Sequence, residues 1–120
     1  MLYLFGIKNC DNVRRTAKFL KTNQINYIFH DFRESPVNKS IIQSWIDAGA
    51  TVKELFNTRG TRYRTLKLKE HILSDDDKIE WMAKENMLIK RPVLMLSGTV
   101  VVGYNEKQMH QLFPDQVLSK

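Results

Sequence analysis

In the first third of the chain, short apolar runs typical of strands stand on either side of a segment with helical spacing of apolar residues. Residues 2–7 form a short apolar run, typical of a strand. A polar loop follows, and then apolar side chains recur at helical spacing until Asn23, where a second short apolar run begins at residues 27–31. The helical positions are Val13, Ala17 and Leu20. The pattern predicts a βαβ unit with two parallel strands and a right-handed crossover.

The middle of the chain has mainly helical periodicity. An amphipathic helix is predicted over residues 38–49 and a shorter one over 52–56. Residues 57–72 are basic and predicted to be irregular, and another helix is predicted to begin after Ser74. Its first turn is acidic, which suits the positive end of a helix dipole. We therefore expect a helical insertion at approximately residues 35–88.

Strand periodicity returns near the C-terminus. Residues 92–96 and 100–102 flank Ser97-Gly98-Thr99, which is typical of a hairpin, and residues 105–112 predict a last helix. The predicted fold is α/β and thioredoxin-like: a mixed central sheet built from βαβ and ββα halves, with the helical insertion between them. The length and the absence of a linker predict a single domain over residues 1–120.

Composition narrows the class of protein. Apolar residues make up 42% and charged residues 27%, as in ordinary globular proteins. No apolar run is long enough for a signal peptide core or a membrane span, so a cytoplasmic monomer without membrane contact is expected. A net charge of +6 favours anionic partners. The basic stretch at 59–69 could contact nucleic acid, but solvated basic segments are common, and we expect no direct binding.

The chain has one cysteine, Cys10, which excludes an intramolecular disulfide and a multi-cysteine zinc site. The three histidines have no metal-ligand spacing, so no metal site is expected. Cys10 follows the first strand and precedes the first helix, where backbone N–H groups and nearby cations favour a thiolate. The cations closest in sequence are Lys8, Arg14 and Arg15. A lone cysteine can also be a buried apolar residue, but the polar neighbours of Cys10 favour a reactive role.

A second candidate feature is Lys90-Arg91-Pro92, directly before a predicted strand. Proline can begin a strand without the loss of a ladder hydrogen bond. An arginine fixed at this place could present its fork of donors to an oxyanion, although a solvated arginine is the alternative. Arg59 and Arg62 could similarly hold a glutathione carboxylate or a substrate anion.

Four motifs together resemble the arsenate-reductase-like family, which includes the Spx regulators. They are Gly6-Ile7-Lys8-Asn9-Cys10, Leu55-Phe56-Asn57-Thr58-Arg59-Gly60 with Tyr63-Arg64 after it, Ile89-Lys90-Arg91-Pro92-Val93, and Val102-Gly103-Tyr104. The resemblance spans nearly the whole chain. It implies a thioredoxin-like fold in which a cis proline, Pro92, faces the catalytic Cys10.

The resemblance also implies an anion site, of which this chain keeps a part. Arg91 matches an oxyanion-binding arginine, whereas Asn57 stands at the place of the family's first such arginine and Arg59 comes two positions later. The family's last oxyanion-binding arginine corresponds to a position within residues 100–103, which contain no arginine in this chain. Arg91, Arg59, Asn57 and Lys8 are thus the candidate anion-binding residues.

Several charge-assisted donors usually hold an oxyanion, so arsenate itself is not the expected substrate. The expected activity is that of a thiol-dependent oxidoreductase. It would bind no cofactor, and an external thiol such as glutathione, another small thiol or a thiol-containing protein would resolve Cys10.

The alternative function comes from the Spx branch of the family. Residues 102–106, followed by Phe113-Pro114, look like the corresponding stretch of Spx proteins, which bind the α subunit of RNA polymerase. Spx redox sensing uses a second cysteine three positions after the first, where this chain has Val13. The resemblance therefore also allows a regulator that binds the polymerase α C-terminal domain without a disulfide switch.

Overall fold

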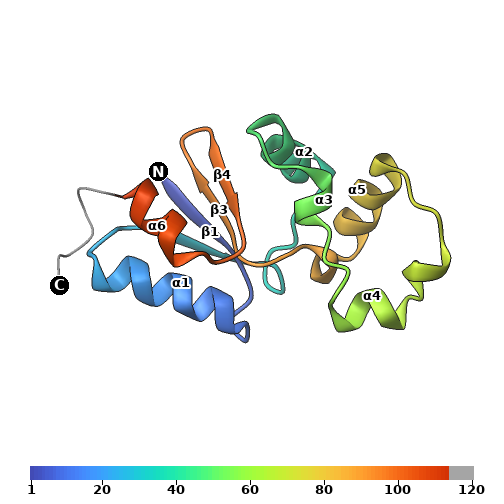
Figure 1. Ribbon diagram of the computed structural model, residues 1–120, viewed down its shortest axis with the longest axis horizontal. Helices are drawn as coiled ribbons and strands as arrows, with labels where there is room; N and C mark the ends of the chain where they lie inside the picture. Colours follow the sequence, from blue (N-terminus) through green and yellow to red (C-terminus); the bar gives the residue numbers. More distant parts are fainter. Residues whose placement is uncertain (114–120) are drawn as a thin grey trace.

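A four-stranded mixed sheet forms one half of the molecule in the computed structural model, which describes residues 1–113 (Figure 1). The strands are β1 (Leu2–Gly6), β2 (Ile28–Asp31), β3 (Val93–Leu96) and β4 (Thr99–Val102). Their order in the sheet is β2-β1-β3-β4. β1 pairs with β2 in parallel, whereas the β1–β3 and β3–β4 pairs are antiparallel. This confirms the predicted parallel N-terminal half and antiparallel C-terminal half.

Two helices belong to the sheet and four belong to the insertion. The sheet helices are α1 (Asp11–Thr22) and α6 (Glu106–Leu112). The insertion contains α2 (Lys39–Asp47), α3 (Val52–Leu55), α4 (Thr61–Thr65) and α5 (Asp75–Lys84), with 3₁₀ turns η1 (Leu68–Glu70) and η2 (Asn86–Leu88). The insertion extends the molecule to 48 × 27 × 25 Å. No helix within residues 1–113 is long and apolar enough to cross a membrane.

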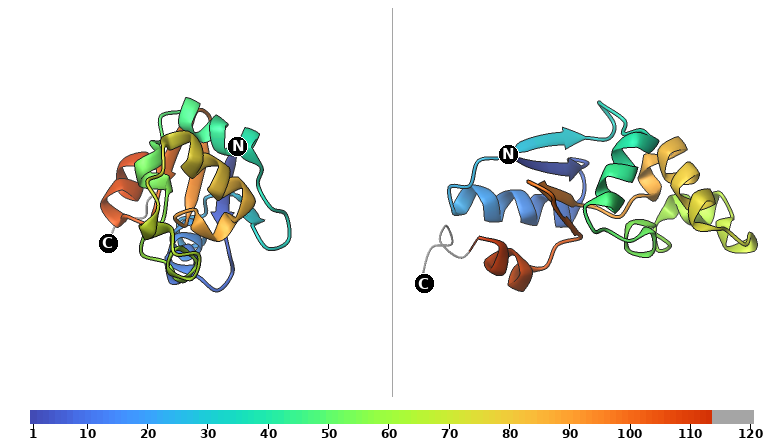
Figure 2. Two further views of the ribbon diagram at one scale, coloured as in Figure 1. Left: turned by 90° about the vertical axis from the view of Figure 1, so that its right-hand side faces the viewer. Right: turned by 90° about the horizontal axis from the view of Figure 1, so that it is seen from above.

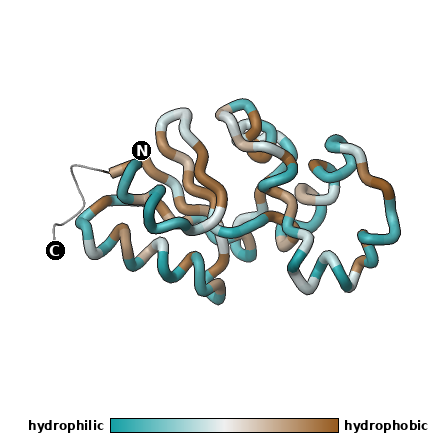
Figure 3. Tube along the Cα trace, viewed as in Figure 1, coloured by the Kyte–Doolittle hydropathy of each residue, from teal (hydrophilic) through white to brown (hydrophobic). Residues whose placement is uncertain are grey.

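The two faces of the sheet bury different side chains because residues along a strand alternate in direction. On one face, Leu2 and Leu4 of β1 pack with residues of α1 and α6, Met109 among them. On the other, Phe5 belongs to the core of the insertion and meets the ring of Trp45 edge-on at 5.0 Å. Figure 2 shows α1 and the insertion helices apart from one another, and Figure 3 shows the apolar strands between more polar helices. The arrangement confirms the thioredoxin-like fold with a helical insertion between its halves.

Strand register brings distant parts of the chain to one edge of the sheet. Phe5 pairs with Val93, and Val93 pairs with Val102. The strands therefore place the end of β1, the residues before β3 and the residues after β4 at the same edge. Cys10 follows β1 by four residues, and Pro92 precedes β3 directly. The topology therefore places the Cys10 loop and Pro92, which are distant in sequence, at the same edge of the sheet.

A short antiparallel bridge attaches the insertion to this edge. Phe56 bridges Ile89, the Asn57 N–H donates to the Leu88 carbonyl at 2.7 Å, and the Lys90 N–H donates to the Leu55 carbonyl at 2.7 Å. Phe56, predicted as the last residue of a helix, instead follows α3 in an extended conformation. The bridge explains this difference, because its partner Ile89 lies far away in sequence.

The structure corrects two other local predictions. Residues 57–72 contain α4 and η1 and are not irregular throughout. The apolar pattern missed α4 because this helix has no buried residue. The hairpin turn consists of Ser97 and Gly98 alone, both with positive φ, so Thr99 pairs with Leu96 as the first residue of β4. Two positive φ values match the twist of a two-residue hairpin.

Asn86 joins the beginning and the end of the insertion. Its side-chain oxygen accepts the Val37 N–H at 2.8 Å, and its amide donates to the carbonyls of Val37 at 3.0 Å and Met82 at 2.9 Å. Asn86 is buried, so its hydrogen bonds have little competition from water. They fix the chain just ahead of Arg91.

Replacement of Asn86 by leucine should leave the buried Val37 backbone groups without partners. We expect Asn86→Leu to lower the free energy of unfolding by about 3 kcal/mol, because each unsatisfied buried polar group costs roughly 1–3 kcal/mol. Urea unfolding measures this change. The control is Asn26→Leu, an exposed asparagine, with an expected effect below about 0.5 kcal/mol. Equal effects of the two substitutions would contradict the role given to Asn86.

Candidate functional site

Cys10 occupies the N-cap position of α1. Its backbone is extended, and its carbonyl accepts the Arg14 N–H at 2.9 Å, so the helix begins directly after it. Its side chain is half-buried and makes no capping hydrogen bond. Cys10 thus lies at the end of the helix where backbone N–H groups lack intrahelical partners, and it also packs against both apolar cores of the molecule.

A close contact between β1 and α1 sets the position of the Cys10 loop. A Cβ atom on Gly6 would lie only 2.5 Å from a methyl carbon of Val13. Only glycine lets the end of β1 approach the first turn of α1 so closely. Three residues, 7–9, then suffice to connect Gly6 to Cys10 across the edge of the sheet. The sequence shows Gly6 but gives no sign of this contact.

Two of the cations near Cys10 in sequence have acidic partners. Lys8 pairs with Glu34 at 3.2 Å, and Arg14 pairs with Asp11 at 2.9 Å. All four side chains are well exposed, so these ion pairs contribute little to stability. The side chain of Lys8, a predicted anion-binding residue, is thus directed to Glu34 in this structure.

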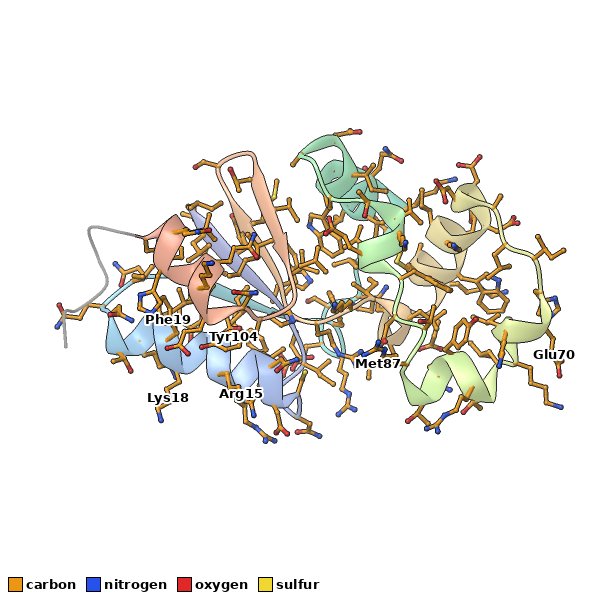
Figure 4. The ribbon with its side chains drawn as sticks, viewed as in Figure 1. Arg15, Lys18, Phe19, Glu70, Met87 and Tyr104 are labelled. Atoms are coloured by element: carbon orange, nitrogen blue, oxygen red, sulfur yellow. The ribbon has the colours of Figure 1, made fainter. Side chains whose placement is uncertain are left out.

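Arg15, the third cation, influences Tyr104 after β4. Burial raises the pKa of Tyr104 above its ordinary value, the Glu106 carboxylate raises it further, and the Arg15 guanidinium lowers it. Figure 4 shows Arg15 on α1 and Tyr104 beside this helix. The phenol of Tyr104 therefore stays neutral to a higher pH than that of an ordinary tyrosine.

Arg91 has a fixed and incompletely satisfied guanidinium group. The Arg91–Pro92 peptide bond is cis, as the family resemblance implies. Nη1 of Arg91 donates to the Met87 carbonyl at 3.1 Å and contacts the Met87 sulfur at 3.7 Å. Its Nε is buried and has no hydrogen-bond partner, and no carboxylate within residues 1–113 forms an ion pair with it. A half-buried cation without a counter-charge is costly unless an anion joins it.

A pocket of about 290 Å³ lies beside Arg91. Its lining residues are Gly60, Thr61, Arg62, Thr65, Met87 and Arg91. The structure therefore brings Arg62 and Arg91 to one cavity, where Arg62 also pairs with Glu85 at 3.6 Å. Cys10 is not among the lining residues, so the thiol and the pocket are two separate features and not one cavity.

The other predicted site residues have different surroundings. The side-chain oxygen of Asn57 accepts the Arg59 N–H at 3.1 Å, which orders the loop between α3 and α4. The side chain of Arg59 is exposed and has no ion pair in the described part of the chain. Pro92 is buried, and its carbonyl accepts the Gly103 N–H at 2.7 Å. Pro92 is thus fixed between β3 and the end of β4.

Sequence reasoning missed Met87 and Glu85, which position the two pocket arginines. Met87 acts through its backbone carbonyl, for which side-chain identity gives no signal. Its spacing of four residues before Arg91 is the one available hint. Within residues 1–113, no group of three or more His, Cys, Asp or Glu side chains could hold a metal ion.

Comparison with known proteins gives a consistent result over nearly the whole chain. The model of the ArsC family matches residues 5–112. The uncharacterized protein YusI of Bacillus subtilis is 32% identical over 92% of this chain and 96% of its own. A crystal structure from Streptococcus mutans, described as a possible arsenate reductase, is 34% identical, covers 91% of this chain and 97% of its own, and has a TM-score of 0.76.

Transcriptional regulators are also among the relatives. The global transcriptional regulator Spx of Lactiplantibacillus plantarum is 21% identical over 98% of this chain and 89% of its own. A structure described as a possible arsenate reductase and a sequence named as a transcriptional regulator therefore both match nearly the whole of this chain.

Proposed function

The chain belongs to the ArsC family, and on that premise we propose that it is a thiol-dependent oxidoreductase with Cys10 as its nucleophile. The uncapped, half-buried sulfur at the N-terminus of α1 is the main support for this proposal. A helix N-terminus stabilises a thiolate, and the thiolate is the reactive form of cysteine. The family resemblance adds that the matching cysteine is catalytic in arsenate reductases.

The proposed reaction has two thiol–disulfide exchange steps. The Cys10 thiolate attacks one sulfur of a mixed disulfide, the S–S bond breaks, and the other sulfur leaves as a thiolate. Cys10 is then disulfide-bonded to one half of the substrate. An external thiol such as glutathione attacks this bond and regenerates Cys10, so the external thiols supply both electrons. Because Cys10 is the one cysteine in the sequence, the second step needs a thiol from another molecule.

We propose that Arg91 holds an anionic group of the substrate. Its guanidinium has no acidic partner within the described residues and lies at a pocket with two threonines. A glutathione carboxylate suits this environment, because guanidinium binds carboxylate through two parallel hydrogen bonds. Arsenate itself is not proposed, because two of the family's three oxyanion arginines are missing from the matching positions.

A second candidate function is regulatory. Spx relatives match nearly the full length of this chain, which supports a role in transcription through the α subunit of RNA polymerase. Val13 replaces the second cysteine of the Spx pair, so the proposed regulator would bind without an intramolecular disulfide switch. The stretch at 102–106 that resembles Spx lies at the end of β4 and the start of α6, whereas Pro114 lies outside the described residues.

The first test concerns Cys10. We expect Cys10→Ser to reduce turnover of a glutathione–peptide mixed disulfide to the uncatalysed rate, because the hydroxyl cannot form the covalent intermediate. Glutathione oxidation coupled to a reporter enzyme measures the rate. Ser40→Ala, an exposed substitution on α2, is the control and should keep the wild-type rate. A wild-type rate equal to that of Cys10→Ser would contradict the oxidoreductase proposal.

The second test separates Arg91 from the thiol chemistry. Arg91→Met should raise the KM for the glutathione mixed disulfide about tenfold to a hundredfold, because charged hydrogen bonds contribute roughly 1.5–3 kcal/mol. It should leave turnover of uncharged hydroxyethyl disulfide nearly unchanged. Arg64→Met removes an exposed arginine outside the pocket and should alter neither substrate. Equal losses on both substrates in Arg91→Met would contradict an anion-binding role.

The third test addresses the regulatory candidate. If the chain is an Spx-like regulator, purified RNA polymerase α C-terminal domain should bind it at micromolar concentration. Wild type and Cys10→Ser should bind equally, with and without reductant, because the contact is noncovalent. Titration calorimetry measures the affinity. Absence of binding at these concentrations would eliminate this function and leave the oxidoreductase proposal untouched.

A further inference from the structure

Helix α1 has a basic stripe on its exposed side. The stripe consists of Arg14, Arg15, Lys18 and Lys21, all exposed. Arg14, Lys18 and Lys21 are spaced by four and three residues and lie along one side of the helix, with Arg15 beside them. The buried Val13, Thr16 and Leu20 lie on the opposite side. Figure 4 shows the side chains of Arg15 and Lys18 on the side of α1 that faces away from the strands.

The charges of this stripe are largely uncompensated. Arg14 pairs with Asp11, but Arg15, Lys18 and Lys21 form no ion pair with any residue in the range 1–113. Like charges three or four residues apart disfavour a helix, and cations near its N-terminus oppose the dipole. Arg14 and Arg15 therefore do not stabilise α1 through its dipole, whereas Lys21 lies in the last turn, where a cation is favourable. The exposed and largely unpaired stripe is available to an anionic surface of another molecule.

The stripe also lies next to the proposed nucleophile. Cys10 is the N-cap of the same helix, so the first basic residue follows one turn after the sulfur. From Arg14 to Lys21 the stripe extends along the axis by about 10 Å, at 1.5 Å per residue. A molecule bound along the stripe would therefore extend toward the end of the helix that carries Cys10.

We propose that the basic stripe of α1 docks an acidic protein surface whose own cysteine resolves the disulfide formed on Cys10. This inference rests on the proposed oxidoreductase function and names the class of its thiol donor. The partner's thiolate attacks Sγ of Cys10 in the mixed disulfide, the substrate's thiolate leaves, and a Cys10–partner disulfide forms. A second thiol of the partner then breaks that disulfide and releases Cys10 as a thiolate, which leaves the partner oxidised.

A protein suits the stripe better than the other anionic surfaces. Every exposed residue of α1 is polar, so the helix has no exposed apolar side chain to enter a lipid headgroup layer. It also has no exposed aromatic ring on which a base could stack, since Phe19 is half-buried and packs against His110. Acidic side chains on a protein surface need neither feature.

The test uses short cysteine peptides as probes. Wild-type protein is first converted to the mixed disulfide of Cys10 with thionitrobenzoate, a coloured leaving group. Three peptides that differ only in a run of glutamates, serines or lysines before Gly-Cys then attack it, and colour release gives the rate. At an ionic strength of about 0.02 M, the acidic peptide should react about tenfold faster than the serine peptide, and the lysine peptide more slowly. At about 0.5 M salt the difference should disappear.

Paired charge reversals locate the effect on the molecule. Lys18→Glu/Lys21→Glu should abolish the preference for the acidic peptide. Lys53→Glu/Lys69→Glu changes the net charge equally at exposed positions of the insertion and should retain the preference. Uncharged mercaptoethanol should react equally with all forms, which shows that Cys10 itself is intact. Circular dichroism checks that both variants are folded.

The outcomes are distinct. Equal rates for the three peptides on wild type, or equal losses in the two double variants, would overturn the docking proposal. Tighter binding of duplex DNA or anionic phosphatidylserine vesicles than of the acidic peptide, lost in Lys18→Glu/Lys21→Glu, would reassign the stripe to nucleic acid or membrane. Because the mixed disulfide is made chemically, these rates do not depend on turnover of a glutathione substrate. A failure of the docking proposal is therefore distinguishable from a failure of the enzymatic one.

Discussion

The segment from Leu88 to Pro92 is held from two sides, and the candidate site depends on this constraint. On one side, Leu88 and Lys90 exchange backbone hydrogen bonds with Asn57 and Leu55 of the insertion. On the other, the Pro92 carbonyl accepts from Gly103, where β4 ends. The two bonds to the insertion close loops of more than thirty residues, and the Pro92–Gly103 bond spans the hairpin of β3 and β4, so none of them follows from the residues next to Arg91. They place Arg91 at the junction of the two halves of the molecule and fix the backbone that carries its guanidinium.

The thiol is positioned by a different mechanism, which is local. Gly6 lets β1 and α1 approach, and the helix then begins with its N-cap at Cys10. The thiol of Cys10 is therefore carried by the sheet and its first helix, whereas the pocket arginines lie where the insertion meets the sheet. A substrate that uses both must bridge these two parts.

The sequence predicted correctly those helices and strands whose formation depends on residues close to one another in the chain. The βαβ unit, the hairpin and the capped helix after Ser74 all have their signals within a few residues, and the structure contains each of them. The helix α4 was not predicted, because it buries no side chain and its sequence therefore lacks the helical spacing of apolar residues. The extended Phe56 escaped because its partner, Ile89, is distant in sequence. The candidate site has the same limit. The sequence identifies Cys10 and Arg91 by their residue types and neighbours, but it does not predict the hydrogen bond from Arg91 to the Met87 carbonyl.

The cationic side chains of the two candidate binding regions differ in their exposure to solvent, and therefore in how they attract anions. Arg91 is half-buried, so its attraction to an anion is short-ranged, weakly screened and dependent on geometry. Arg15, Lys18 and Lys21 are exposed, so their attraction is long-ranged, weak for each charge and sensitive to salt. The first environment can select a small ligand, and the second can orient a large one before contact. Under the proposed function both kinds of recognition would act at the single Cys10, because the substrate and the thiol donor would reach the same sulfur in succession.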